Sequence, residues 1–136
     1  MTDEKVSKEV AEADFCRFAD EMDIDTDVNE MNEETKEGFE QQKSQIVRAI
    51  QRGTLVVNEN AEPVFTPSRS VNPNPITFTM PTGAALMAMD RKKKSEDMGK
   101  MYAAMAEICG VPVKTFAMMA MPDLKVCLAI TSLFLG

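Results

Sequence analysis

The sequence contains no histidine and no tryptophan, and it has only three cysteines in 136 residues. Without histidine the chain lacks the usual general base near neutral pH and the commonest metal ligand. The Ser-His, Cys-His and His-metal arrangements are therefore excluded. Because no other nucleophile or metal set is evident, we expect a protein that is not an enzyme, with no catalytic residue and no cofactor.

The cysteines, Cys16, Cys109 and Cys127, are odd in number, far apart and set among apolar neighbours. This pattern predicts buried free thiols in a reducing compartment, not a disulfide framework or a zinc site. The chain also has no run of about eighteen apolar residues, the length that predicts a membrane span. Its polar, acidic start predicts that no secretory signal is present. We therefore expect a cytoplasmic protein that does not enter a membrane.

The net charge of −7 is distributed unevenly along the chain. Residues 1–62 carry seventeen Asp and Glu against seven Lys and Arg, whereas residues 63–136 carry five against eight. An acidic half does not favour nucleic acid, and the basic run at residues 91–94 lacks the aromatic residues of a nucleic-acid site. The acidic residues either attract a basic partner or only keep the chain soluble, and both interpretations stay open.

Apolar residues at helical spacing predict helices over residues 5–22 and 33–52. The second should begin after Asn32 as N-cap and end at Gly53. Residues 54–57 and 63–67 predict a β-hairpin, and the prolines of its second strand predict an edge position. Residues 76–80 predict a third strand that could join the hairpin.

Three further helices follow: residues 84–90, residues 95–108 capped by Ser95, and a last helix that starts at Pro122. Residues 113–119 form a short segment before that last helix. The expected fold is mainly α with a small antiparallel β-hairpin or three-stranded sheet, the α+β class, and its C-terminal half is helical. Two regions are expected. Residues 1–70 form an acidic helical region that ends in the hairpin, and residues 71–136 form a strand plus a methionine-rich helical domain.

Residues 23–34 invite a calcium hypothesis. The side chains that fall on ligand positions of an EF-hand loop are Asp23, Asp25, Asp27, Asn29 and Glu34. The sixth position, which requires glycine for a sharp turn, is Val28. An acidic loop between two helices is therefore the favoured interpretation, and a calcium-binding module is a lesser alternative.

Nine of the twelve methionines lie between Met80 and Met121. Methionine is flexible and polarizable, and it suits surfaces that repack against several shapes. A region of about sixty residues cannot bury all of them, so some should form an exposed apolar patch that binds a partner protein. The candidate partner-binding residues are Met87, Met98, Met101, Met105, Phe116, Met118 and Met119.

Four stretches of the C-terminal half carry a family resemblance: residues 76–83 (Ile-Thr-Phe-Thr-Met-Pro-Thr-Gly), 108–112 (Ile-Cys-Gly-Val-Pro), 121–124 (Met-Pro-Asp-Leu) and 134–135 (Phe-Leu). Their order resembles the small tail assembly chaperones of long-tailed bacteriophages. The resemblance covers about the last sixty residues, and residues 1–70 do not follow the pattern.

The resemblance implies a non-enzymatic phage or prophage protein of the host cytoplasm that binds the tape-measure protein or other tail proteins. It also implies a longer product made by ribosomal frameshifting. A structural phage protein of the tail or neck, which stays in the particle, is the alternative. Self-association is left open by the residues.

Overall fold

The computed structural model describes residues 6–70, 74–92 and 97–135. Its elements are α1 (Lys8–Glu21), a 3₁₀ turn η1 (Val28–Glu30), α2 (Glu33–Arg52), β1 (Leu55–Val57), β2 (Pro63–Phe65), β3 (Ile76–Thr77), α3 (Gly83–Asp90), α4 (Asp97–Cys109), α5 (Val113–Ala117) and α6 (Met121–Leu135). The described residues thus form six α-helices and one three-stranded antiparallel sheet, with a helical C-terminal half. The expected mainly α, α+β class is confirmed. Ser95, the predicted cap of α4, lies outside the described residues.

Local signals set both ends of α2. The side chain of Asn32 accepts a hydrogen bond from the backbone N–H of Thr35 at 2.8 Å, as expected of an N-cap. Gly53 ends the helix in the left-handed conformation, with φ of 82°, which glycine adopts without strain. Between these ends Phe39, Ile46 and Ile50 form the buried stripe.

The sheet has the strand order β1-β2-β3, and both pairs are antiparallel. The second strand of the hairpin is therefore central, and its predicted edge position is wrong. Proline is tolerated because Pro63 is the first residue of β2, and its carbonyl still accepts a hydrogen bond from the Phe78 N–H at 2.8 Å. The guanidinium of Arg17 on α1 donates to the carbonyls of Val57 and Asn58, both at 2.7 Å, which attaches the hairpin to that helix.

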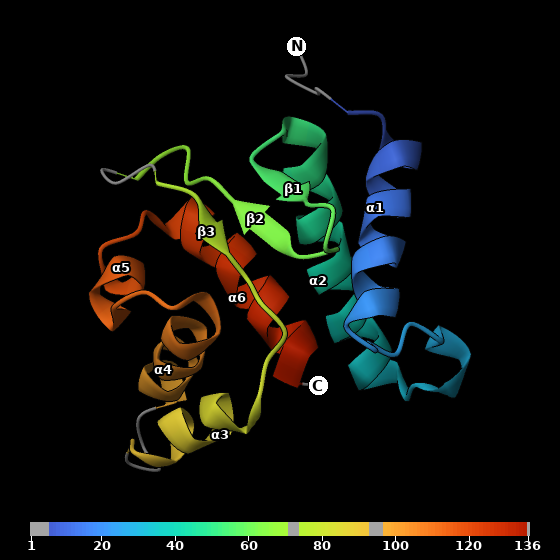
Figure 1. The fold of residues 1–136 in the computed structure, drawn as a ribbon. Coiled ribbons are helices and arrows are strands. Elements are labelled where there is room, and N and C mark those ends of the chain that lie inside the picture. The colour runs from blue at the N-terminus through green and yellow to red at the C-terminus, as the bar shows by residue number, and fades with distance from the viewer. Residues whose placement is uncertain (1–5, 71–73, 93–96, 136) are drawn as a thin grey trace.

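One hydrophobic core joins the N-terminal and C-terminal regions. Figure 1 shows α6 in the middle of the molecule, with α1 and α2 on one side and α3, α4 and α5 on the other. Ile46 of α2 and Ile130 of α6 are both fully buried, and the rings of Phe18 and Phe134 meet edge to face at 5.7 Å between centroids. β2 and β3 also pair across the boundary expected at residues 70–71. No helix of the described residues is both long enough and apolar enough to cross a membrane.

Because both regions share this core, we expect Ile130→Ala to lower the free energy of unfolding by about 3 kcal/mol. Urea unfolding followed by circular dichroism measures the change. The control is Val56→Ala, since Val56 is exposed, and it should alter stability by less than about 0.5 kcal/mol. Two separate transitions, with only one of them shifted by Ile130→Ala, would contradict a shared core.

Candidate functional site

The structure separates the candidate partner-binding residues into three groups by burial. Met87, Met98 and Met118 are exposed, and Met101 is half-buried. Met105, Phe116 and Met119 are buried, and Met105 and Phe116 expose none of their surface. All three belong to the core. In this conformation Met105 and Phe116 offer no side-chain surface to a partner, and Met119 reaches only the hollow beside α5.

Other exposed apolar residues of this half were not among the candidates. In the part of the chain that the structure describes, the large apolar side chains with high exposure include Met80, Leu86, Val113 and Met121. Leu86 precedes Met87 on α3, and Met121 begins α6 three residues after Met118. We define the apolar surface as Leu86, Met87, Met98, Met118 and Met121.

Helix α3 has the reverse of the usual amphipathic arrangement. It packs mainly against α4, and its buried residues are two alanines, Ala85 and Ala88. Leu86 and Met87, which are larger and more apolar, are 59% and 62% exposed. A helix that served only its own core would bury the large side chains and expose the small ones. The sequence signal was present in the Ala-Ala-Leu-Met-Ala order, but periodicity alone does not say which side faces the core.

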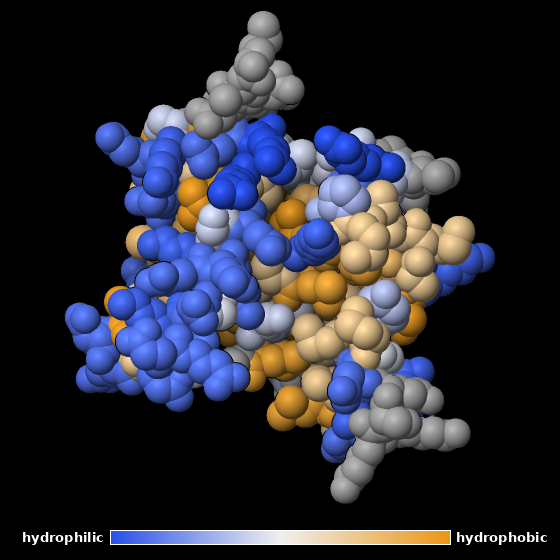
Figure 2. Space-filling model, turned by 180° about the vertical axis from the view of Figure 1, so that it is seen from behind, coloured by the Kyte–Doolittle hydropathy of each residue, from blue (hydrophilic) through white to orange (hydrophobic). Residues whose placement is uncertain are grey.

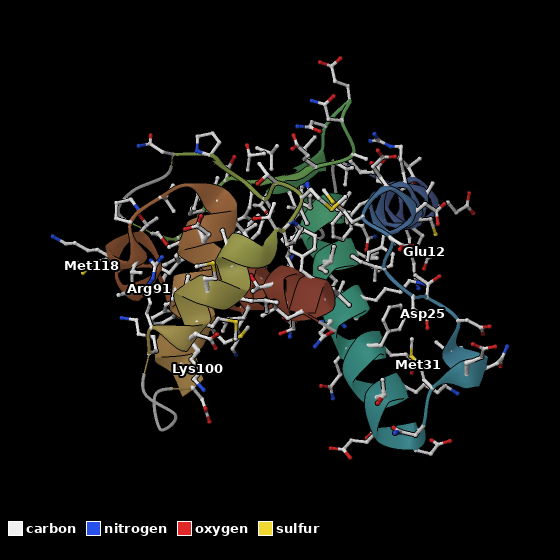
Figure 3. The ribbon with its side chains drawn as sticks, turned by 60° about the horizontal axis from the view of Figure 1, so that its bottom comes forward. Glu12, Asp25, Met31, Arg91, Lys100 and Met118 are labelled. Atoms are coloured by element: carbon white, nitrogen blue, oxygen red, sulfur yellow. The ribbon has the colours of Figure 1, made fainter. Side chains whose placement is uncertain are left out.

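Exposed apolar side chains and the acidic loop lie at opposite sides of the molecule (Figure 2 and Figure 3). In the view from behind, hydrophobic surface gathers over the half formed by the C-terminal helices, whereas the side of α1 is hydrophilic (Figure 2). Met118, Arg91 and Lys100 lie at one end, and Glu12, Asp25 and Met31 lie at the other (Figure 3). The apolar surface therefore sits with basic side chains, away from the acidic loop.

A hollow of about 520 Å³ lies beside α5 and extends the apolar surface inward. Its walls include Ile76, Val111, Pro112, Met118 and Met119, with Lys114 as its one charged lining residue. Met118, which is 70% exposed, stands at its margin. A flexible side chain in this place can change rotamer to fit an incoming apolar group.

In the acidic loop, residues 23–34, two carboxylates accept hydrogen bonds from backbone N–H groups, and one of them caps the 3₁₀ turn η1. Asp23 adopts the left-handed conformation, with φ of 55°, directly after α1. The Oδ1 atoms of Asp25 and Asp27 accept hydrogen bonds from the backbone N–H groups of Asp27 and Asn29 at 3.0 and 3.1 Å. Among the described residues, which include all of 23–34, no three acidic or cysteine side chains are placed to hold a metal ion. The geometry gives the calcium alternative no support.

Asp123, in the first turn of α6, is the buried carboxylate of a hydrogen-bonded cluster with Ser68, Arg69 and Ser70, which we call the Asp123 clamp. Its side chain is 3% exposed and accepts hydrogen bonds from the N–H groups of Ser68 and Arg69 and from the hydroxyl of Ser70, at 3.2, 2.9 and 2.7 Å. The Ser70 hydroxyl in turn accepts from the Ala120 N–H at 3.0 Å. A carboxylate near a helix N-terminus is further stabilised by the helix dipole. The clamp thus fixes the segment after β2 against the start of α6, beside the hollow.

We expect Asp123→Asn to lower the free energy of unfolding by about 2 kcal/mol, because the amide removes the charge and cannot accept all of these hydrogen bonds. Chemical denaturation measures the loss. Asp90→Asn is the matched control: Asp90 is exposed, and its substitution should change stability by less than about 0.5 kcal/mol. Equal stability of the two variants would mean that the clamp contributes nothing.

The three cysteines differ in burial. The prediction of a buried thiol is wrong for Cys16, which is exposed, because the buried face of α1 is formed by Ala11, Phe15, Phe18 and Ala19. Cys109 is half-buried and Cys127 fully buried. Burial raises the pKa of the Cys109 thiol to about 12. Burial also raises the pKa of Cys127 well above its usual range, with a smaller contribution from the nearby Cys109 and Asp123.

Since the thiolate is the reactive form, iodoacetamide at about pH 8 should alkylate Cys16 in the folded protein and leave Cys109 and Cys127 almost unmodified. Peptide mass spectrometry identifies the modified positions. The control is the same reaction in denaturant, where all three thiols should react. Rapid alkylation of Cys127 in the folded protein would contradict the burial described above.

Comparisons of this chain with protein-family models, with curated proteins and with solved structures gave no match.

Proposed function

We propose that this protein is a non-enzymatic binding protein that holds a helical segment of another protein on its apolar surface. The observation that carries the proposal is the reversed arrangement of α3, in which Leu86 and Met87 face solvent while Ala85 and Ala88 are buried. Each large side chain left in water forgoes about 1.5–3 kcal/mol that burial would contribute. A partner that covers the surface recovers this free energy on binding.

The chemistry of the surface supports a helical partner. Methionines on α3, α4 and α6 and at the C-cap of α5 supply flexible side chains that adapt to an apolar helix face. The basic side chains Arg91 and Lys100 lie at the same end of the molecule as Met118 (Figure 3). A partner helix with apolar residues on one side and acidic residues beside them would complement both features.

In the setting implied by the resemblance, the partner is the tape-measure protein and the chain is a tail assembly chaperone of a phage or prophage. Such a helper covers the apolar segments of a long helical protein in the host cytoplasm until the tail is built around it. The exposed methionines suit this role, because one surface must accept many similar segments.

The test compares binding of the tape-measure protein by the wild-type chain and by the triple variant Met87→Ser, Met98→Ser and Met118→Ser. All three methionines are exposed, so the substitutions should leave the fold intact. If each side chain contributes about 1 kcal/mol, the triple variant should bind about a hundredfold more weakly. Isothermal titration calorimetry with purified segments of the tape-measure protein measures the change.

The matched control is Val10→Ser with Val56→Ser, which removes exposed apolar side chains from the N-terminal half. It should bind within about twofold of the wild type. Equal affinity of the wild type and the triple variant would refute the apolar surface as the binding site. Mass spectrometry of purified particles separates a chaperone from a structural tail or neck protein, since only the latter stays in the particle.

A further inference from the structure

A groove of about 450 Å³ lies at the acidic end of the molecule, away from the apolar surface. The loop after α1, the N-terminal half of α2 and the last turns of α6 form its walls. Its apolar lining is Ile24, Met31, Phe39 and Leu133, and its acidic lining is Asp25 and Glu34. Figure 3 shows Asp25 and Met31 on the loop beside α2.

Gly38 lines this groove from inside α2, where glycine is less favourable than alanine because it loses more backbone freedom on folding. A Cβ added to Gly38 would meet no heavy atom within 4 Å. The residue also does not adopt the left-handed conformation seen at Gly53 and Gly110. Neither packing nor backbone geometry within the chain requires glycine here, and the missing side chain leaves this wall of the groove open.

The segment that carries the loop wall of the groove is strongly acidic. Residues 20–34 contain eight acidic side chains and no basic one, and Lys36 on α2 is the nearest basic residue along the chain. Apolar side chains in the groove and carboxylates at its rim complement an apolar side chain flanked by lysine or arginine. Helices and a loop line the groove, and no strand edge is present there for an extended peptide to join, so the fitting mode is a helix in a groove.

We propose that this groove binds a basic amphipathic helix of a partner protein. The helix inserts a leucine-sized side chain over Gly38 and places its lysines or arginines against Asp25 and Glu34. This site is separate from the apolar surface and goes beyond the proposed function, because it gives the protein a second docking surface of opposite charge character. A protein with both surfaces can bring two partners together.

The test uses a fluorescein-labelled peptide of about 15 residues, roughly four helical turns, with leucines along one face and lysines elsewhere. Two control peptides keep the length: one has the same composition in scrambled order, and one has glutamate in place of lysine. Fluorescence anisotropy measures their affinity for the full chain. We expect the amphipathic lysine peptide to bind at least about tenfold more tightly than either control.

Gly38→Leu places a side chain in the groove without changing the charge and should weaken binding of the lysine peptide by at least about tenfold. Gly38→Ala, which adds one methyl group, should bind within about threefold of the wild type. Both variants should remain folded, because a Cβ at position 38 meets no heavy atom within 4 Å. Circular dichroism should show melting temperatures equal to or higher than that of the wild type. Unchanged peptide binding by Gly38→Leu would overturn the proposal.

The charge requirement has its own control. Asp25→Asn with Glu34→Gln should weaken binding by about fivefold at low salt and reduce its salt dependence. Glu9→Gln with Glu59→Gln removes the same charge from exposed positions outside the groove and should retain wild-type affinity within about twofold. Equal weakening by the two pairs would indicate attraction to net charge alone and would overturn a specific site.

Sedimentation velocity tests whether the groove is instead occupied by a second copy of this chain. A concentration-dependent dimer of the wild type that disappears in Gly38→Leu would assign the groove to a second copy of this chain and overturn the partner proposal. The variant Met87→Ser, Met98→Ser and Met118→Ser should retain peptide affinity, because none of these residues lines the groove. Failure of the apolar surface to bind its partner would therefore not affect the groove proposal. Failure of the groove to bind the peptide would likewise not affect the proposed function.

Discussion

The packing of α6 against α2 is the interaction on which the rest of the molecule depends. Ile130, Leu133 and their neighbours on α6 are buried in the same core as Ile46 and Ile50 of α2. This contact joins the acidic N-terminal region to the helices that follow the sheet. It also relates the two surfaces to each other: Met121 at the start of α6 belongs to the apolar surface, and Leu133 near its end lines the acidic groove. Along this helix of 15 residues, Met121 and Leu133 are separated by an axial rise of about 18 Å.

At both surfaces the residues present are less stabilising for the folded chain than the alternatives would be. On α3, alanines occupy the buried positions and larger apolar side chains occupy the exposed ones. On α2, a glycine stands in the middle of the helix with free space around it. The Asp123 clamp, in contrast, raises stability, because it anchors the segment after β2 with charge-assisted hydrogen bonds. Departures from the most stable local choice are expected where a protein binds something, and here they occur at both candidate surfaces.

Elements with strong local signals were predictable from the sequence. Asn32 and Gly53 define α2 to the residue, because a cap and a left-handed stop act through the backbone within one helical turn. The position of β2 was not predictable in this way. Its prolines suggested an edge, but strand order depends on pairing between residues far apart in the sequence, and the pairing of Phe65 with Ile76 makes β2 central. The burial of Cys16 was predicted wrongly for a related reason: its neighbours Phe15 and Phe18 are apolar, but they lie on the other face of α1.

The α+β class, the boundaries of the helices with clear caps, the charge asymmetry and the excess of methionine over what a small domain can bury all follow from local sequence patterns. Which methionines are exposed depends on tertiary packing, because Met105 and Met118 have the same side chain and differ only in whether other residues pack over them. The groove at Gly38 is likewise a tertiary feature. Its lining comes from the loop after α1, from α2 and from α6, and no local pattern shows that chain folding will bring the residues near Ile24 beside Leu133.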